Sequence, residues 1–336
     1  MGEKTFKTFQ EQAERLIENG CVGDVVEIKS KLASINYYRL SAYWYPFRKQ
    51  NPNYDPAQQD SRPKLDQLIG GTKFQDIVAL YDFDHALKTH VFKAIERIEV
   101  ALRTKTAYYW CAFRKKKTNA QEELDSDFLE EIQKLYQSSK DECVKHQKNA
   151  YNISHVKNLP VWVFVELTTF THLQRIYKSF EEPLRIRIAN EFGFKTINSF
   201  QSSVSLVKEA RNVCAHYGRF WNKSWTVQTH SKGTGTSVKT PLLRQTTFSD
   251  ILKYSWNETN KTWETTSNPK NKQLSLSKTA SLLVIIAEID KKITGSNKWA
   301  EELVSLIKTQ KPDTSLNLYE EMGLIGDWGK HPAFLQ

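Results

Sequence analysis

The chain has 336 residues, of which 39% are hydrophobic and 12% aromatic, so it can bury a sizeable core and is not a mainly disordered protein. Lys and Arg number 48 against 38 Asp and Glu, which gives a formal net charge of +10 at pH 7. This excess favours a polyanionic partner, either nucleic acid or an anionic membrane surface.

The first third of the chain shows a helical pattern. Apolar residues recur at spacings of three and four, which predicts amphipathic helices over residues 6–17, 24–35 and 36–48. Residues 50–72 are rich in Pro, Gly, Asn, Gln and Asp and are expected to form a loop. A long helix is then predicted from 74 to about 113.

The middle of the chain begins with residues 115–149, which are charged and poor in apolar residues, so we expect a solvated helical insertion there. Proline is favoured in the first turn of a helix, and Pro160 opens a predicted helix that extends to 180. Two further helices are predicted over 183–192 and over 197 to about 216. Beyond these, the pattern favours a small hairpin at 254–265 and later helices.

Several classes of site and location are not indicated. The four cysteines form no CxxC pair and are too few for a disulfide scaffold, which favours a reducing cytoplasm. The N-terminus lacks the apolar stretch of a signal peptide, and the longest apolar run, 280–287, is too short to cross a membrane. Phosphate-binding glycine motifs, HExxH and GxSxG are all absent, so we expect no nucleotide, metal or other cofactor.

Two windows, 28–54 and 210–249, contain no Asp or Glu but carry several cations and aromatic rings. Cations hold phosphates and aromatic faces stack on unpaired bases, which is the combination that single-stranded RNA sites use. For most rings of the first window, core packing is the favoured interpretation, because they share helix faces. The residues expected to contact RNA are Tyr37, Tyr38, Arg39, Arg48, Tyr217, Arg219, Trp221 and Lys223.

The sharpest motif is Arg211-Asn212-Val213-Cys214-Ala215-His216, near the end of the predicted helix 197–216. A long guanidinium and an imidazole at a helix end can converge on one phosphate. An RNA 2′-hydroxyl can attack the neighbouring phosphate when an imidazole moves protons and a fixed cation neutralises the developing charge. We therefore expect His216 as general acid or base, Arg211 as stabiliser of the phosphate, and Asn212 as an orienter, with no metal.

The spacing alone is weak, since a chain with this composition yields on the order of one Arg-x4–6-His match by chance. The alternative is a structural His at a helix C-terminus, stabilised by the helix dipole beside a surface Arg.

The motif does not stand alone. It is accompanied, in order, by Ile35-Asn36-Tyr37-Tyr38-Arg39-Leu40-Ser41-Ala42-Tyr43-Trp44, Leu80-Tyr81-Asp82-Phe83-Asp84, Ile95 to Arg103, Pro160-Val161-Trp162, Arg219, Trp221, Asn222, Met322-Gly323, Trp328 and His331-Pro332. Together these strings resemble the Abi-like abortive-infection family, the AbiD/AbiF group, whose Arg-x4–6-His motif is that of HEPN ribonucleases. The chain departs from the family pattern at Thr169-Phe170-Thr171 and at Tyr217, where the family often has Ser-Phe-Gly and a His.

This resemblance implies an all-α fold: a HEPN-type helical bundle with an N-terminal helical region, C-terminal helices and a minor β hairpin. The expected regions are 1–72, the core 73–225 with an insertion near 115–150, and 226–336. It also implies an antiphage or toxin-like, metal-independent endoribonuclease that is regulated by a cognate structured noncoding RNA. The alternative is a non-catalytic RNA-binding protein of a ribonucleoprotein defence system.

A homodimer is expected in the active state, because two proton-transfer groups on one phosphate would require two copies of His216. Val204, Leu206 and Val207 offer an apolar face for such pairing, unless they pack against the long helix of their own chain.

Overall fold

Helices dominate the computed structural model, which describes residues 5–58, 61–114, 124–230, 237–241, 254–265, 272–274 and 277–335. The α-helices of the described chain are α1 (Phe9–Glu18), α2 (Val25–Ser34), α3 (Tyr37–Trp44), α4 (Phe74–Phe113), α5 (Ser126–Ser138), α6 (Glu142–Ala150), α7 (Val161–Glu166), α8 (Phe170–Ser179), α9 (Glu182–Glu191), α10 (Ile197–Ala215), α11 (Thr279–Thr294), α12 (Lys298–Gln310) and α13 (Leu318–Met322). The strands are β1 (Arg48–Gln50), β2 (Lys64–Leu68), β3 (Thr226–His230), β4 (Ser237–Pro241), β5 (Tyr254–Asn257), β6 (Thr262–Thr265) and β7 (Lys272–Gln273). The expected all-α fold with minor β hairpins is confirmed.

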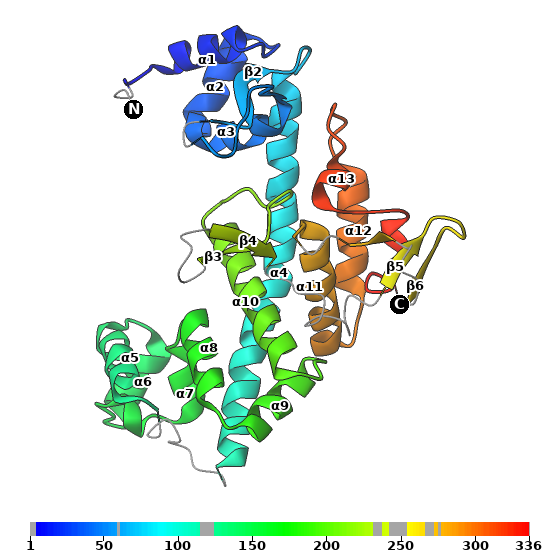
Figure 1. The fold of residues 1–336 in the computed structure, drawn as a ribbon. Coiled ribbons are helices and arrows are strands. Elements are labelled where there is room, and N and C mark those ends of the chain that lie inside the picture. The colour runs from blue at the N-terminus through cyan, green and yellow to red at the C-terminus, as the bar shows by residue number, and fades with distance from the viewer. Residues whose placement is uncertain are drawn as a thin grey trace.

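Helix α4 is the axis of the molecule (Figure 1). Its forty residues, about 60 Å of helix at 1.5 Å per residue, match the predicted bounds. Helices α1 to α3 lie at its N-terminal end, α5 to α8 at its C-terminal end, and α10 and α11 pack along its middle. Leu80, Leu87 and Val91 are completely buried in this packing. Burial of each such side chain contributes roughly 1.5–3 kcal/mol.

The helices start where polar side chains cap free backbone N–H groups. Asp24 accepts hydrogen bonds from the backbone of Val26 and Glu27 at the start of α2, as the sequence predicts. Thr196 caps α10 in the same way, because its hydroxyl accepts from the backbone N–H of Ser199. These caps fix the point at which each helix enters the core.

The single helix predicted from 160 to 180 is wrong, because the structure has two helices there, α7 and α8. The hydroxyl of Thr168 donates to the carbonyl of Val165, and Thr169 forms a capping box with His172. Threonine side chains that bond the local backbone compete with helix continuation and favour a new N-terminus. The chain therefore turns between α7 and α8, so the two helices bring separate faces to α4.

Two other expectations need correction. Residues 64–68, part of the expected loop 50–72, form β2, which pairs antiparallel with β1. In the expected solvated insertion, α5 buries Phe128, Leu129, Ile132 and Tyr136 on one face, although it is charged on the other. The sequence pattern underestimated α5 because four apolar residues suffice to anchor a short amphipathic helix. Residues 115–123 of the insertion lie outside the described residues.

The C-terminal hairpin 254–265 is confirmed, as β5 pairs antiparallel with β6, and β7 adds to β5. Its Trp256 and Trp263 are directly opposite and make an edge-to-face ring contact. Gly326 lies so close to the Trp256 ring that a Cβ atom there would overlap it. This contact joins the hairpin to the C-terminal segment.

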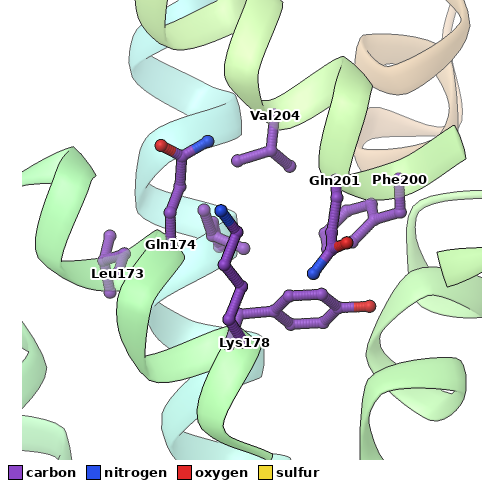
Figure 2. Close-up of a pocket in the computed structure, with 8 residues that line it drawn as sticks. Leu173, Gln174, Lys178, Phe200, Gln201 and Val204 are labelled. Carbon is purple, nitrogen blue, oxygen red and sulfur yellow. The ribbon is translucent and has the colours of Figure 1, made fainter. Parts of the chain in front are cut away.

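Helices α8 and α10 meet over α4 along a well-packed seam (Figure 2). Leu173, Gln174 and Lys178 of α8 face Phe200 and Gln201 of α10 around a cavity of about 10 Å³. A cavity of this size holds about one water molecule, so it is a packing defect and not a ligand site.

Candidate functional site

The Arg-x4-His motif occupies the C-terminal end of α10. Arg211 and Asn212 are half-buried in its last turns, and the exposed His216 caps the helix by donating its backbone N–H to the carbonyl of Asn212, at 2.9 Å. Tyr217 then adopts a left-handed backbone conformation, with φ of 57°, and Gly218 bonds back to the helix. The imidazole is thus presented to solvent on a tight turn at a helix end.

Arg211 is tethered by a carboxylate of α4. Its Nε lies 3.8 Å from Oε2 of Glu99, and its side chain is 40% exposed. The other Glu99 oxygen, Oε1, accepts a 2.7 Å hydrogen bond from Arg103, whose guanidinium also donates to the carbonyl of Val165. One carboxylate is therefore hydrogen-bonded to Arg103 of α4 and forms a longer ion pair with Arg211 of α10, whose Nε makes no hydrogen bond. The exposed part of the Arg211 guanidinium remains free for an anion.

A buried carboxylate holds the turn after the motif. Asp84 is completely buried and accepts hydrogen bonds from the backbone N–H groups of Phe220 and Trp221, the latter at 2.7 Å, and from the Tyr43 hydroxyl at 2.7 Å. The ammonium of Lys88, one turn along α4, lies 3.3 Å from it. Buried charges require such pairing. Sequence reasoning missed Asp84 as a site residue, although a carboxylate on the apolar stripe of a helix signals a buried role.

Three further contacts fix the turn. Lys88 donates to the carbonyl of Gly218 at 3.0 Å. From α3, Arg39 donates to the carbonyl of Tyr217 at 2.7 Å and lies over its ring. At the start of α11, the Thr279 hydroxyl donates to the carbonyl of Phe220 at 3.1 Å. The motif turn is therefore a meeting point of α3, α4, α10 and α11.

The structure separates the residues predicted to contact RNA into two groups. Trp221 is fully buried, so its ring has no face for a base, and that prediction is wrong for this side chain. Arg219 is also structural, since its guanidinium donates to the carbonyl of Ala42 at 2.5 Å. Tyr37 packs edge-on against Trp44. Arg48 pairs with Asp66 at 3.0 Å, so its charge is already compensated.

The second group remains on the surface and is joined to the motif turn by Arg39, which contacts Tyr217 next to His216. Tyr38 is 85% exposed and Tyr217 is 65% exposed, with Arg39 joining their two segments. Lys223 is half-buried, and its ammonium lies over the Trp225 ring. We call Arg211, His216, Tyr217, Tyr38 and Arg39 the motif surface.

In the window 28–54, the alternative of core packing is confirmed for Tyr43, Trp44 and Phe47, which are buried.

The apolar face proposed for pairing is used inside the chain. Val204 is 6% exposed, and Leu206 and Val207 are completely buried, as α10 packs against α4 and α8. The prediction that this face is available to a second copy is wrong, and the alternative of internal packing is confirmed. Residues 231–236 and 242–249 of the second window lie outside the described residues.

The described residues also bear on thiol chemistry, metal binding and membrane insertion. Cys214 is buried, and burial raises the pKa of its thiol to about 12, so it is not a nucleophile at neutral pH. Within the described residues, no group of three or more His, Cys, Asp or Glu side chains is arranged to hold a metal ion. None of the helices over those residues is both long and apolar enough to cross a membrane.

The fold and site define an all-α protein with an exposed Arg–His motif at the end of a core helix. The sequence model of Abi-like proteins matches residues 30–222, more than half of the chain and all of the motif, so the chain belongs to the Abi-like protein family. Membership associates the chain with abortive infection, a form of antiphage defence. No curated protein and no solved structure matches it.

Proposed function

We propose that the chain is a metal-independent endoribonuclease of HEPN type that acts in antiphage defence. The observation that carries the proposal is the exposed His216 on a turn held rigid by buried Asp84, with the tethered guanidinium of Arg211 on the same helix end. Catalytic groups are effective when their positions are fixed before the substrate binds. The contacts that α3, α4 and α11 make with this turn provide that fixation.

The proposed reaction needs no group beyond the RNA and the protein. The 2′-oxygen attacks the adjacent phosphorus, the bond from phosphorus to the 5′-oxygen breaks, and the products end in a 2′,3′-cyclic phosphate and a 5′-hydroxyl. One proton leaves the 2′-hydroxyl and one is delivered to the 5′-oxygen, and His216 performs at least one of these transfers. Arg211 stabilises the negative phosphate oxygens, while Asn212 orients Arg211 or His216.

The rest of the motif surface binds the RNA strand. Tyr38 and Tyr217 offer ring faces for unpaired bases, and Arg39 offers positive charge for phosphates, as does Lys223 outside the motif surface. The net charge of +10 favours a stable RNA partner, and we include a cognate structured noncoding RNA as regulator in the proposal. We retain a two-fold arrangement of the active form, for which the argument is now the need for two imidazoles rather than an apolar face.

The test compares wild type, His216→Ala and a control, His146→Ala, on total RNA and on a labelled single-stranded oligonucleotide. His146 is an exposed histidine of α6, away from the motif. We expect His216→Ala to lose cleavage by at least about 100-fold, as general acid–base groups contribute 10²–10⁴, while RNA binding and the circular dichroism spectrum stay unchanged. Cleavage by wild type and control should persist in EDTA and leave 2′,3′-cyclic phosphates.

Metal-dependent cleavage that leaves 3′-hydroxyl ends would contradict this mechanism. Wild-type protein that binds RNA without cleaving it would favour the alternative, a non-catalytic RNA-binding protein. Light scattering on active, RNA-free protein tests the pairing, and full activity of a strict monomer over a wide concentration range would exclude a shared site.

A further inference from the structure

A cavity of about 640 Å³ lies between the C-terminal half of α4 and α7, away from the motif turn. Its volume is in the range of ordinary small-molecule sites, roughly 300–1,000 Å³. From α4 it is lined by Arg103, Ala107, Tyr108 and Cys111, and from α7 by Trp162 and Glu166, among others.

The lining combines open aromatic rings with a few polar groups. Tyr108 is 67% exposed and Trp162 is 54% exposed, although aromatic rings of this size are usually buried. The polar residues of the lining include Glu166, whose carboxylate is an acceptor, and Arg103, whose guanidinium also donates to Glu99 and to the Val165 carbonyl. A flat ring that stacks on aromatic faces and carries both hydrogen-bond donors and acceptors at its edge fits this lining. A nucleobase has these properties.

The cavity is connected to the motif through Glu99. Its Oε1 binds Arg103, which lines the cavity, and its Oε2 faces Arg211 at 3.8 Å. From Glu99 to Tyr108 is nine residues along α4, about 13 Å at 1.5 Å per residue. A single strand whose phosphate lies at Arg211 can therefore reach the cavity within a few nucleotides.

We propose that this cavity binds an unpaired base of the RNA strand that occupies the motif surface, stacked on Tyr108 and Trp162. The inference rests on the proposed function only in taking RNA as the ligand of Arg211. It does not require cleavage. Binding of a base in the cavity would then determine which phosphate of the RNA lies at Arg211.

Cys111 provides a direct reporter of occupancy, since it lines the cavity. Cys21 and Cys214 are buried, and Cys143 is replaced by Ser in every protein used. Burial raises the pKa of the Cys111 thiol, so its alkylation by iodoacetamide is followed at mildly alkaline pH by mass spectrometry. The probe is a 2′-O-methyl oligonucleotide, which lacks the attacking hydroxyl and cannot be cleaved by the proposed reaction.

We expect saturating oligonucleotide to slow Cys111 alkylation at least about fivefold. Because stacking of one base on an aromatic ring contributes 1–3 kcal/mol, Trp162→Ala and Tyr108→Ala should each raise the concentration needed for protection by about fivefold or more. The matched control is Tyr151→Ala, which removes an equally open ring, 63% exposed, beyond α6. It should leave protection unchanged, and circular dichroism checks the fold of all three.

The outcomes separate this inference from the nuclease proposal, because the 2′-O-methyl oligonucleotide is not cleaved and protection of Cys111 is therefore measured without the nuclease reaction. Binding of the oligonucleotide in a mobility shift without protection of Cys111 would overturn the inference. Protection by mononucleotides but not by the oligonucleotide would also overturn it, in favour of a free-nucleotide site. Protection that grows with protein concentration alone would assign the cavity to a second copy of the chain.

Discussion

The buried pair of Asp84 and Lys88 gives the most stringent test of how the motif turn is held. The substitution Asp84→Asn keeps the size of the side chain but removes its charge. Lys88, which is 7% exposed, then keeps a buried ammonium without its counterion at 3.3 Å. The new amide N–H₂ group is itself a donor, so it cannot accept the hydrogen bonds that Asp84 now receives on that side. The donors to Asp84 include the backbone N–H groups of Phe220 and Trp221.

Removal of one partner from a buried ion pair costs about 3–5 kcal/mol. For a chain of 336 residues this corresponds to a decrease of roughly 4–7 °C in Tm, since the unfolding entropy scales with length. We expect this loss in urea unfolding followed by circular dichroism. The double variant Asp84→Asn with Lys88→Met removes both charges, so it should be less destabilised than the two single losses added together, by at least about 1 kcal/mol.

The comparison variant is Tyr43→Phe, which removes the 2.7 Å hydroxyl hydrogen bond to Asp84 and the longer one, 3.4 Å, that the hydroxyl accepts from Lys88, and it should cost about 1–2 kcal/mol. A loss below about 1 kcal/mol for Asp84→Asn, or strict additivity in the double variant, would refute the assignment of Asp84 as the anchor of the turn.

Two other predictions concern the C-terminal region. Burial lowers the pKa of His331 to about 4 from 6.5, so between these values its imidazole is neutral in the folded protein but protonated in the unfolded chain. The free energy of unfolding should therefore fall as pH decreases below about 6.5, by about 2 kcal/mol at pH 5 and about 3 kcal/mol at pH 4. Urea unfolding at pH 7 and pH 5 should show that His331→Asn lacks this pH-dependent loss. Equal losses in both proteins would contradict the prediction. At Gly326, where φ is 55° and the Trp256 ring fills the space, Ala should cost about 2–4 kcal/mol. Gly70→Ala, with open space around it, should stay within about 0.5 kcal/mol, and similar Tm values for the two alanine variants would argue against this packing.

The sequence predicted well those elements whose signal is local and long. The bounds of α4 followed from forty residues of unbroken periodicity, and α10 ended within a residue of its predicted limit. The break between α7 and α8 was not predicted, because Thr169 caps a helix through its hydroxyl without interrupting the apolar pattern. Likewise, β2 forms only because β1 lies beside it, which no local pattern encodes.

The site was predictable as a motif but not as an arrangement. Arg211 and His216 stand out in the sequence, whereas their anchors, Glu99 and Asp84, lie more than a hundred residues earlier and resemble ordinary helix positions. For Trp221 the sequence predicted an RNA contact that the structure does not support. Composition alone could not distinguish a stacking ring from a core ring, and three-dimensional packing places this one in the core.

The dependence of the motif turn on Thr279 has a consequence for biosynthesis. The turn at Phe220 receives its last partner from the start of α11, about sixty residues further along the chain. A ribosome that has only just released α10 has therefore produced the motif without the contact that completes its turn. Loop contacts of long sequence separation form late, because the intervening chain must be ordered first. The motif turn is therefore complete only after α11 has been translated, so truncated chains that stop before α11 are made without the Thr279 contact.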